Sequence, residues 1–178
     1  MDIGKILPGP KGKVPSVVYV FVEIPKGSKI KYEFDKEANI LVADRMLHTS
    51  YVYPGDYGFI PQCVGEDKDF LDCLVLVNEP GYPGTLISAR PIAIMRMVDE
   101  GGRDDKIIAV PADDVDPRFK DIRDLQDLPK HYVKELKHFF EHMKELEPGK
   151  WARIEKFEDA EAAKKAIKIG IALYKENK

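Results

Sequence analysis

The acidic run Asp67-Lys68-Asp69-Phe70-Leu71-Asp72 leads directly into the apolar stretch Cys73-Leu74-Val75-Leu76-Val77. Three carboxylates therefore lie just before a strongly apolar predicted strand, where crowding raises their pKa values unless a cation neutralises them. Carboxylate oxygens are hard ligands, and Mg²⁺ is the matching cation, with Mn²⁺ or Ca²⁺ as alternatives. The run predicts a divalent-metal site built on a sheet, although a solvated polar loop before a strand would look similar.

The composition is that of a globular chain, with 178 residues, 44% hydrophobic and 33% charged. This length fits one domain, 1–178, in which residues 1–16 are expected to form an irregular arm rich in proline and glycine. The net charge of -3 gives no overall basic field, so we expect no nucleic-acid partner. No run reaches membrane-spanning length and no stretch resembles a signal peptide, so we expect a cytoplasmic protein without a membrane partner. The two cysteines form no zinc-like spacing, and Cys73 is predicted to be a buried thiol.

Segments on both sides of the acidic run are rich in β-branched and aromatic residues, which predicts strands. The expected strands are 17–24, 29–34, 40–43, 73–77, 85–98, 106–110 and 151–157. Residues 51–61 are expected to form a rigid aromatic loop, because proline and glycine interrupt their tyrosines. Residues 99–104 predict a hairpin turn.

Apolar residues recur at three- and four-residue spacing after residue 125, which predicts an amphipathic helix. Asp127 is its expected N-cap, Leu146 belongs to its apolar stripe, and Pro148-Gly149 ends it. A second helix is expected over 159–176, and Trp151 is expected in the core. Strands first and helices last indicate an α+β domain, a small barrel or sheet covered by helices.

Three histidines lie on the first of these helices. His138 and His142 are four residues apart and could chelate a metal, but an exposed stripe shared with His131 is the interpretation that we favour.

Further charged residues could complete a site with the acidic run. Asp99 and Asp104 bracket a glycine turn just before Lys106, which is either a solvated hairpin tip or part of the site. The basic residues on or beside strands are Lys29, Lys31, Arg45 and Lys106, and Tyr53 and Tyr57 could donate hydrogen bonds beside them. Such groups bind phosphate, so together with metals they suit hydrolysis of a small, highly charged phosphate.

Six motifs occur in the order and at the spacing seen in family I soluble inorganic pyrophosphatases, which the chain resembles over residues 17–175. The motifs are Glu23-Ile24-Pro25, Ile30-Lys31-Tyr32-Glu33, Asp44-Arg45, residues 53–58, the three aspartates of the acidic run, and residues 99–106 with Ala109-Val110-Pro111. The resemblance implies an α+β fold, a five-stranded OB-like β-barrel with additional strands and two C-terminal helices packed on it. It also implies hydrolysis of inorganic diphosphate to two phosphates by attack of a metal-bound hydroxide. The implied cofactor is Mg²⁺, as several ions with Mn²⁺ as a substitute, and the implied assembly is a cytoplasmic homo-oligomer, a hexamer.

The resemblance also implies a role for each matching residue. Asp69 would be the general base. The implied metal ligands are Asp67, Asp72, Asp99 and Asp104, of which Asp72 bridges two ions. The implied phosphate-binding residues are Lys31, Arg45, Tyr57, Lys106 and Lys144. The residues implied to act from behind these or through water are Glu23, Glu33 and Tyr53.

The sequence departs from the family pattern at three positions. The acidic run usually reads D-G-D-P-x-D, whereas this chain has Lys68 and Phe70 in place of the glycine and the proline. If the glycine position has a positive φ, Lys68 strains the loop. Met143 stands where the family usually has a tyrosine that contacts phosphate, and a thioether cannot donate that hydrogen bond. Losing it would cost about 1.5–3 kcal/mol.

Two other functions remain open from the residues. An OB-type module that binds phosphate and metal without turnover is one alternative, since sequence-tolerant single-strand binders pair a basic groove with stacking aromatics. The interleaved carboxylates argue against it, because they would repel a nucleic-acid backbone. A metal-dependent hydrolase of nucleotides or polyphosphate is chemically close, but the sequence offers no base pocket.

Overall fold

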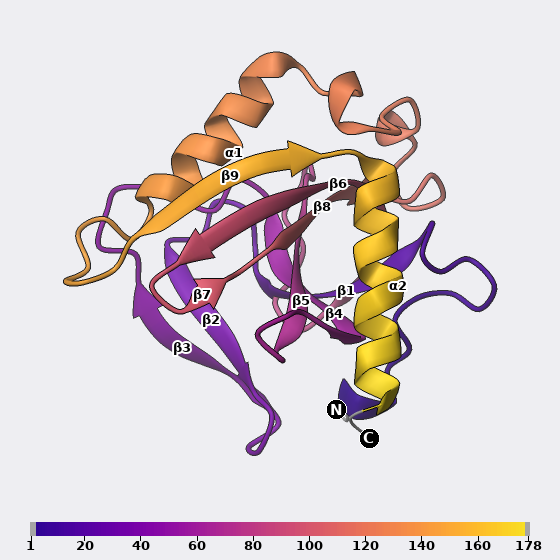
Figure 1. The fold of residues 1–178 in the computed structure, drawn as a ribbon, viewed down its shortest axis with the longest axis horizontal. Coiled ribbons are helices and arrows are strands. Elements are labelled where there is room, and N and C mark those ends of the chain that lie inside the picture. The colour runs from indigo at the N-terminus through magenta and orange to yellow at the C-terminus, as the bar shows by residue number, and fades with distance from the viewer. Residues whose placement is uncertain (1–2, 177–178) are drawn as a thin grey trace.

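The computed structural model describes residues 3–176, and its centre is a closed ring of five strands (Figure 1). The strands are β1 (Val18–Ile24), β4 (Asp56–Val64), β5 (Phe70–Val75), β6 (Leu86–Asp99) and β8 (Lys106–Pro111). They pair in the order β1–β4–β5–β8–β6, and the ring closes because β6 also pairs with β1. Only the β5–β8 pair of this ring is parallel. The predicted α+β class with an OB-like barrel is therefore confirmed.

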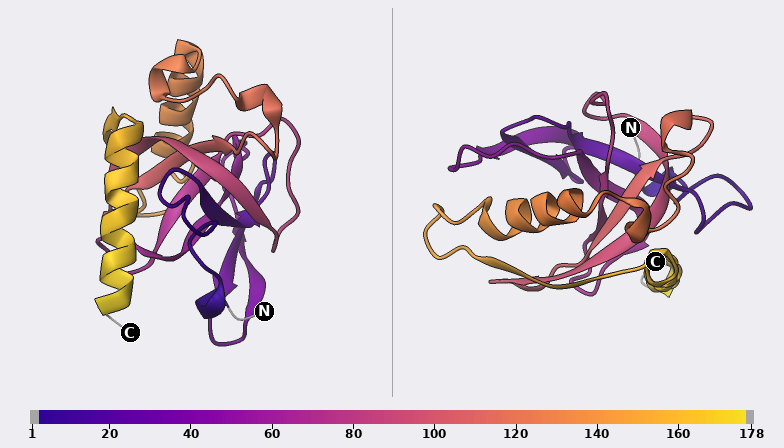
Figure 2. Two further views of the ribbon diagram at one scale, coloured as in Figure 1. Left: turned by 90° about the vertical axis from the view of Figure 1, so that its right-hand side faces the viewer. Right: turned by 90° about the horizontal axis from the view of Figure 1, so that it is seen from above.

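Additional strands extend the barrel. β9 (Ala152–Glu158) and the short β7 (Gly102–Arg103) both pair with β6, and β7 forms the hairpin turn predicted over 99–104. β2 (Ile30–Asp35) and β3 (Ile40–Met46) form a separate two-stranded sheet that projects beside the barrel (Figure 2). β3 extends past the predicted strand 40–43, so it also carries Arg45.

Two helices cover the barrel on different sides (Figure 1). α1 (Lys130–His142) packs against β9, and α2 (Ala160–Glu176) packs against β4 and β6. At Gly170 a Cβ would lie 2.6 Å from the carbonyl oxygen of Val64, so a glycine is needed for this close approach of α2 to β4. The short 3-10 helices are η1 (Ile3–Lys5), η2 (Pro117–Phe119) and η3 (Leu125–Asp127).

The predicted N-terminal arm is irregular apart from η1. Ile3 is buried and packs with Phe21 and Phe59 of the barrel, so the arm is tied to the body of the protein. Residues 1 and 2 of this arm lie outside the described residues.

The core consists mainly of two apolar clusters on opposite sides of the barrel wall. One lies beneath α1 and includes Ile108 and Phe140, and the other lies beneath α2 and includes Ile107 and Cys73. Because successive residues of a strand point to opposite faces, β8 contributes to both clusters. Cys73 is fully buried, as predicted.

Across the described part of the chain, no helix combines the length and apolar character needed to span a bilayer.

The prediction of an aromatic loop over 51–61 is wrong in its second half, because residues 56–64 form β4. A Cβ at Gly58 would lie 1.8 Å from the carbonyl oxygen of Phe21, so the glycine is what lets β4 approach β1. Pairing with β5 becomes irregular further along the strand, where Gln62 has a φ of 54°. Gly58, which looked like a turn residue, instead allows two strands to approach closely, and the irregular pairing around Gln62 is a bulge within β4.

Both predicted ends of the first helix are wrong by a few residues. Asp127 does not cap α1, because its carboxylate accepts hydrogen bonds from two backbone N–H groups at the start of η3. Pro129 precedes the helix instead and makes no side-chain cap. The helix ends at His142 and continues as turns, so Leu146 falls off the apolar stripe and is 62% exposed.

The expectation that Trp151 belongs to the core is also wrong, since its side chain is 48% exposed. Trp151 lies just before β9, whose first paired residue is Ala152, and its backbone N–H donates to the Glu100 carboxylate at 3.3 Å. The strand alternation that would bury a side chain therefore starts after this residue.

The histidines form an outward-facing stripe on α1, as favoured from the sequence. His131 and His138 are exposed and His142 is half-buried. The rings of His138 and His142 stack on each other with their centroids 4.4 Å apart.

Candidate active site

One cavity of about 550 Å³ lies between the β2–β3 hairpin and the barrel, and every residue predicted for the site lines it. The hairpin contributes Lys31, Glu33 and Arg45. The barrel and its loops contribute Glu23, Tyr53, Tyr57, Asp67, Asp69, Asp72, Asp99, Asp104 and Lys106, and Lys144 follows α1. Lys29, the remaining basic residue considered from the sequence, does not line this cavity. Folding thus brings the acidic loop to the same cavity as the hairpin cations Lys31 and Arg45, while Lys106, Tyr57 and Lys144 lie among the carboxylates.

The acidic loop before β5 is a tight turn. The Gly65 N–H donates to the Asp69 carbonyl oxygen at 2.8 Å, and the Asp69 N–H donates to Asp67 Oδ1 at 3.0 Å. Lys68 has a φ of 72°, so its position does require the left-handed conformation that glycine adopts freely. A side chain with a Cβ costs about 1–2 kcal/mol there.

Lys106 lies between two of the predicted metal ligands. Its Nζ atom is 2.8 Å from Asp72 Oδ2 and 2.8 Å from Asp104 Oδ1. The parallel pairing of β5 with β8 places Asp72 opposite Lys106, and Asp104 precedes Lys106 by two residues. The Tyr57 hydroxyl also donates to the Asp72 carboxylate. The buried ammonium therefore partly neutralises this group of carboxylates, and the tyrosine hydroxyl adds a hydrogen bond to Asp72.

Burial and crowding shift the pKa values of several groups in the cavity. Burial, aided by the charge of Asp72, raises the pKa of the Glu23 carboxyl to about 8. Burial raises the pKa of Asp67 and of Asp104, and neighbouring carboxylates add to both shifts while Lys106 opposes the second. Burial alone would lower the pKa of Lys106, but Asp72 and Asp104 outweigh it, so the ammonium stays charged. Such crowded acids favour a bound cation.

The donor set of the cavity suits a hard divalent cation, because all of the predicted ligands are carboxylates. Within residues 3–176, no group of three or more histidine, cysteine, aspartate or glutamate side chains is already gathered closely enough to hold an ion. The ammonium of Lys106 stands between two of the carboxylates. The ligand set Asp67, Asp72, Asp99 and Asp104 therefore stays a prediction.

The hairpin carries anion-binding groups that have carboxylate partners of their own. Lys31 donates to Glu33, and Arg45 donates to Asp44. Arg45 Nε also lies 2.9 Å from Oε2 of Glu147, whose side chain is buried. Lys31 and Arg45 are direct register partners across β2 and β3, so their charges lie side by side. Two cations are thus held in place to bind phosphate oxygens.

A second ion-pair network holds the end of the cavity near α1. Lys144 Nζ lies 2.8 Å from Asp99 Oδ2 and 2.9 Å from Glu100 Oε2, and Lys150 Nζ lies 2.9 Å from Glu100 Oε1. Burial would raise the pKa of Glu100, but hydrogen bonds from Lys150 and Lys144 lower it to about 2. Met143, next to Lys144, is half-buried, lines the cavity and packs against the core.

Sequence reasoning missed four charged residues that contact the site, namely Lys36, Glu100, Glu147 and Lys150. Each looks like an ordinary surface charge in the sequence. Glu100 and Lys150 stand close in sequence to the predicted residues Asp99 and Lys144, which is a weak signal. Nothing in the sequence links Glu147 to its distant partner on β3.

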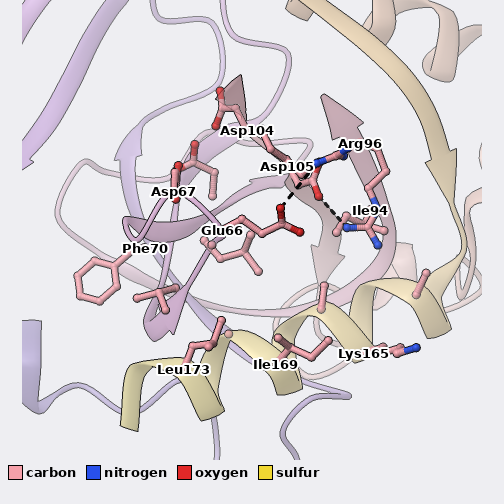
Figure 3. A pocket seen from close by; sticks show the side chains of 18 of the residues that line it. Glu66, Asp67, Phe70, Ile94, Arg96, Asp104, Asp105, Lys165, Ile169 and Leu173 are labelled. Atoms are coloured by element: carbon pink, nitrogen blue, oxygen red, sulfur yellow. Dashed lines mark hydrogen bonds and ion pairs between the residues drawn. The ribbon is translucent and has the colours of Figure 1, made fainter. Parts of the chain in front are cut away.

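A second cavity of about 460 Å³ lies on the other side of the acidic loop, against α2 (Figure 3). Ile169 and Leu173 of α2 form part of its apolar floor, while Asp67 and Phe70 line both cavities. The acidic loop therefore separates the two cavities, and residues of the loop line both.

Asp105 anchors the segment that carries two of the site residues, as Figure 3 shows from the second cavity. Its carboxylate accepts a hydrogen bond from Arg96 Nη1 at 2.7 Å and one from the Met97 N–H at 3.1 Å. Asp105 stands between Asp104 and Lys106 in the chain, so these bonds restrain both neighbours. Asp104 lines both cavities, whereas Lys106, the first residue of β8, lines only the first.

A barrel whose cavity gathers carboxylates with lysines, an arginine and tyrosines is typical of a metal-dependent phosphoryl-transfer hydrolase. A family model described as inorganic pyrophosphatase matches residues 20–175. The inorganic pyrophosphatase of Saccharolobus solfataricus is 52% identical, over 92% of this chain and 95% of its own. That of Aeropyrum pernix is 50% identical, over 94% and 95%. The crystal structure of inorganic pyrophosphatase from Thermus thermophilus matches with a TM-score of 0.93 at 40% identity, covering 98% of this chain and 99% of that one. The chain belongs to the inorganic pyrophosphatase family.

Proposed function

We propose that this chain hydrolyses inorganic diphosphate to two phosphates with Mg²⁺ as its metal. The observation that carries the proposal is the single cavity in which the acidic loop faces Lys31, Arg45 and Lys144. Diphosphate is small and highly charged, so its hydrolysis needs cations on both phosphates and a group that accepts a proton. This cavity offers cationic side chains for the phosphates, carboxylates that can hold metal ions, and a carboxylate that can accept the proton.

Metal binding is assigned to Asp67, Asp72, Asp99 and Asp104, whose crowded carboxylates are the donors that Mg²⁺ prefers. When bound, several Mg²⁺ ions, for which Mn²⁺ can substitute, would neutralise substrate charge and make a water more acidic. The raised pKa values of Asp67 and Asp104 support this assignment, because a cation would relieve the repulsion that contributes to them.

Asp69 is assigned as the general base. Its side chain is 79% exposed at the rim of the cavity, so it can reach an attacking water. Its backbone is fixed by the hydrogen bond from its N–H to Asp67 and by the one that its carbonyl oxygen accepts from Gly65. A carboxylate on a fixed loop suits proton abstraction, which depends on geometry before pKa.

The cations and one hydroxyl are assigned to the phosphates, namely Lys31, Arg45, Tyr57, Lys106 and Lys144. Burial and the nearby Asp72 raise the pKa of the Tyr57 hydroxyl well above its usual range, so it remains a donor at neutral pH. Charge-assisted hydrogen bonds from the lysines and Arg45 would hold both the substrate and the leaving phosphate.

Three further residues are assigned to support these groups. Glu23 accepts the Phe34 N–H at 2.8 Å and so ties β2 to the barrel. Glu33 pairs with Lys31, and the Tyr53 ring packs 5.4 Å from the Tyr57 ring, centroid to centroid. Each thus restrains a neighbour that faces the substrate.

A homohexameric assembly in the cytoplasm extends the proposal, on the strength of the family resemblance. Analytical ultracentrifugation of the purified chain tests the assembly, with a single species of six subunits as the expected result.

Replacing Asp72 with asparagine tests the site assignment. The amide side chain has the same shape as the carboxylate but lacks the negative charge to which Lys106 and Tyr57 donate their hydrogen bonds. Phosphate release from diphosphate should therefore fall to near zero. Circular dichroism of the variant should match the wild type. Unchanged turnover in a folded Asp72→Asn protein would sink the assignment.

Asp114→Asn is the matched control. It makes the same chemical change at an exposed aspartate that does not line the cavity. Its turnover should equal that of the wild type.

A further inference from the structure

The tip of the β2–β3 hairpin reaches over the acidic loop. Lys36 is the first residue after β2, and its Nζ atom lies 3.2 Å from Asp69 Oδ1. Asp35 fixes the turn, because its carboxylate accepts the N–H groups of Glu37 and Ala38 at 2.9 and 2.8 Å. The hairpin therefore presents a positive charge to the residue assigned as general base.

Phe70 holds the same ammonium from a second side. Lys36 Nζ lies 4.7 Å from the centroid of the Phe70 ring, and an aromatic face attracts a cation. The Phe70 ring stacks on Phe59, centroid to centroid 4.9 Å, and Phe59 is buried. The ammonium is thus held over a ring that is itself supported by the barrel.

This contact differs from those of the other hairpin cations. Lys31 pairs with Glu33 of the hairpin itself, and Arg45 pairs with Asp44 of the hairpin and with Glu147 in the turns after α1, so neither contacts the acidic loop. The partner of Lys36 lies on the acidic loop, so the ion pair links the separate two-stranded sheet to that loop. An exposed carboxylate moves among rotamers unless a partner holds it, and Lys36 restricts that freedom at Asp69.

We infer that Lys36 is a positioning residue for Asp69, with Phe70 orienting its ammonium. The inference rests on the proposed function, since it takes Asp69 as the general base. Holding the carboxylate at the rim of the cavity increases the fraction of molecules in which it can accept the proton of the attacking water. Lys36 itself makes and breaks no bond.

Steady-state kinetics of the full chain with Mg²⁺ and diphosphate test this inference. Lys36→Gln should lower kcat about threefold to fivefold, the size that loss of an exposed ion pair gives, and leave KM nearly unchanged. Lys36→Arg should restore most of the loss because it keeps the charge. Lys29→Gln is the matched control, since Lys29 just precedes β2, is exposed and does not line the cavity.

A double-mutant cycle tests the part played by Phe70. Phe70→Leu keeps an apolar side chain but removes the aromatic face, so it should lower kcat by less than Lys36→Gln does. The double variant should be no slower than the slower single variant, because Phe70 acts through Lys36. Unfolding temperatures of Lys36→Gln and the wild type should agree, which separates positioning from folding.

The outcomes distinguish the inference from the function on which it rests. A wild-type protein that releases no phosphate from diphosphate would contradict the proposed function. An active wild type with normal kcat in Lys36→Gln would overturn the inference alone, and so would a raised KM at unchanged kcat, which would make Lys36 a substrate ligand. Additive effects in the double variant would overturn the role of Phe70.

Discussion

The ammonium of Lys106 lies 2.8 Å from the Asp72 carboxylate, and the lysine is only 3% exposed. The two residues stand opposite each other in the parallel pair of β5 and β8, so the fold itself sets this contact. The same ammonium also reaches Asp104. Lys106 thus holds these two carboxylates together.

Lys106→Met should therefore destabilise the metal-free protein. The change removes the charge but keeps the apolar stem, and leaves Asp72 and Asp104 to repel each other. Because both acids are only partly buried, we expect a loss of roughly 1–3 kcal/mol in unfolding free energy with EDTA. Mg²⁺ should restore part of this loss, since ions that bind only the folded state stabilise it.

Urea unfolding of Lys106→Met and the wild type, each with EDTA and with Mg²⁺, measures both effects. Equal stability of the two proteins in EDTA would contradict the role given to Lys106. Lys106→Arg, which keeps the charge, should lose less than the methionine variant.

Glu23 gives a pH-dependent prediction. Its pKa is raised from 4.5 to about 8, so the folded protein binds this proton more tightly than the unfolded chain does. The carboxyl therefore lowers stability as pH rises from 4.5 towards 8. Glu23→Gln keeps an oxygen for the Phe34 N–H but cannot titrate, so its unfolding free energy should fall less over this range.

Urea unfolding in EDTA at about pH 5 and about pH 8 tests the sign of this linkage. The difference between the two pH values should be smaller for Glu23→Gln than for the wild type. Identical pH dependence in both proteins would show that Glu23 does not hold its proton in the folded state.

Lys68→Gly should relieve strain in the acidic loop. Lys68 has a φ of 72°, a conformation that glycine adopts without the steric cost of a Cβ. The greater freedom of glycine in the unfolded chain offsets part of the gain, so we expect a net stabilisation of up to about 1 kcal/mol. Lys68→Ala keeps the Cβ and serves as the control, and it should show no such gain in urea unfolding. A glycine variant less stable than the alanine variant would contradict this account.

Met143→Tyr should supply the hydrogen bond that the thioether cannot donate. Met143 lines the cavity beside Lys144, so a hydroxyl placed there can reach a phosphate oxygen. A hydrogen bond to a charged group contributes about 1.5–3 kcal/mol, which would raise kcat/KM by at least about tenfold. Met143→Phe adds the ring without the hydroxyl and should show no rise. Equal kinetics for the tyrosine and phenylalanine variants would mean that the hydroxyl makes no contact.

Much of the fold could be predicted because its signals are local. Most strands other than β4, the turn over 99–104 and both helices follow from alternation, glycines and helical spacing in their own segments, although β5 spans Phe70–Val75 where the sequence predicts a strand over 73–77. The path of β4 could not be predicted, since Gly58 looks like a loop residue until Phe21 of a distant strand lies against it. The exposure of Trp151 likewise depends on where pairing with β6 begins. That the chain is one domain stays a prediction.

The site could be predicted where residues matched the family pattern, and every residue given a role in this way lines one cavity, although the roles remain predictions. Residues outside the motifs could not be found in the same way. Lys36 meets Asp69 only because the hairpin folds over the loop. Glu147 meets Arg45 only because the turn after α1 reaches β3. Such contacts join distant segments and leave no periodic or spacing signal.

Phosphate release from inorganic diphosphate, measured with Mg²⁺, with EDTA, and with ATP in place of diphosphate, tests the central claim most directly. The cavity predicts rapid release from diphosphate with Mg²⁺, loss of release in EDTA, and little release from ATP. No release from a folded protein that still binds Mg²⁺ would contradict the claim. That result would favour a barrel that binds phosphate and metal without turnover.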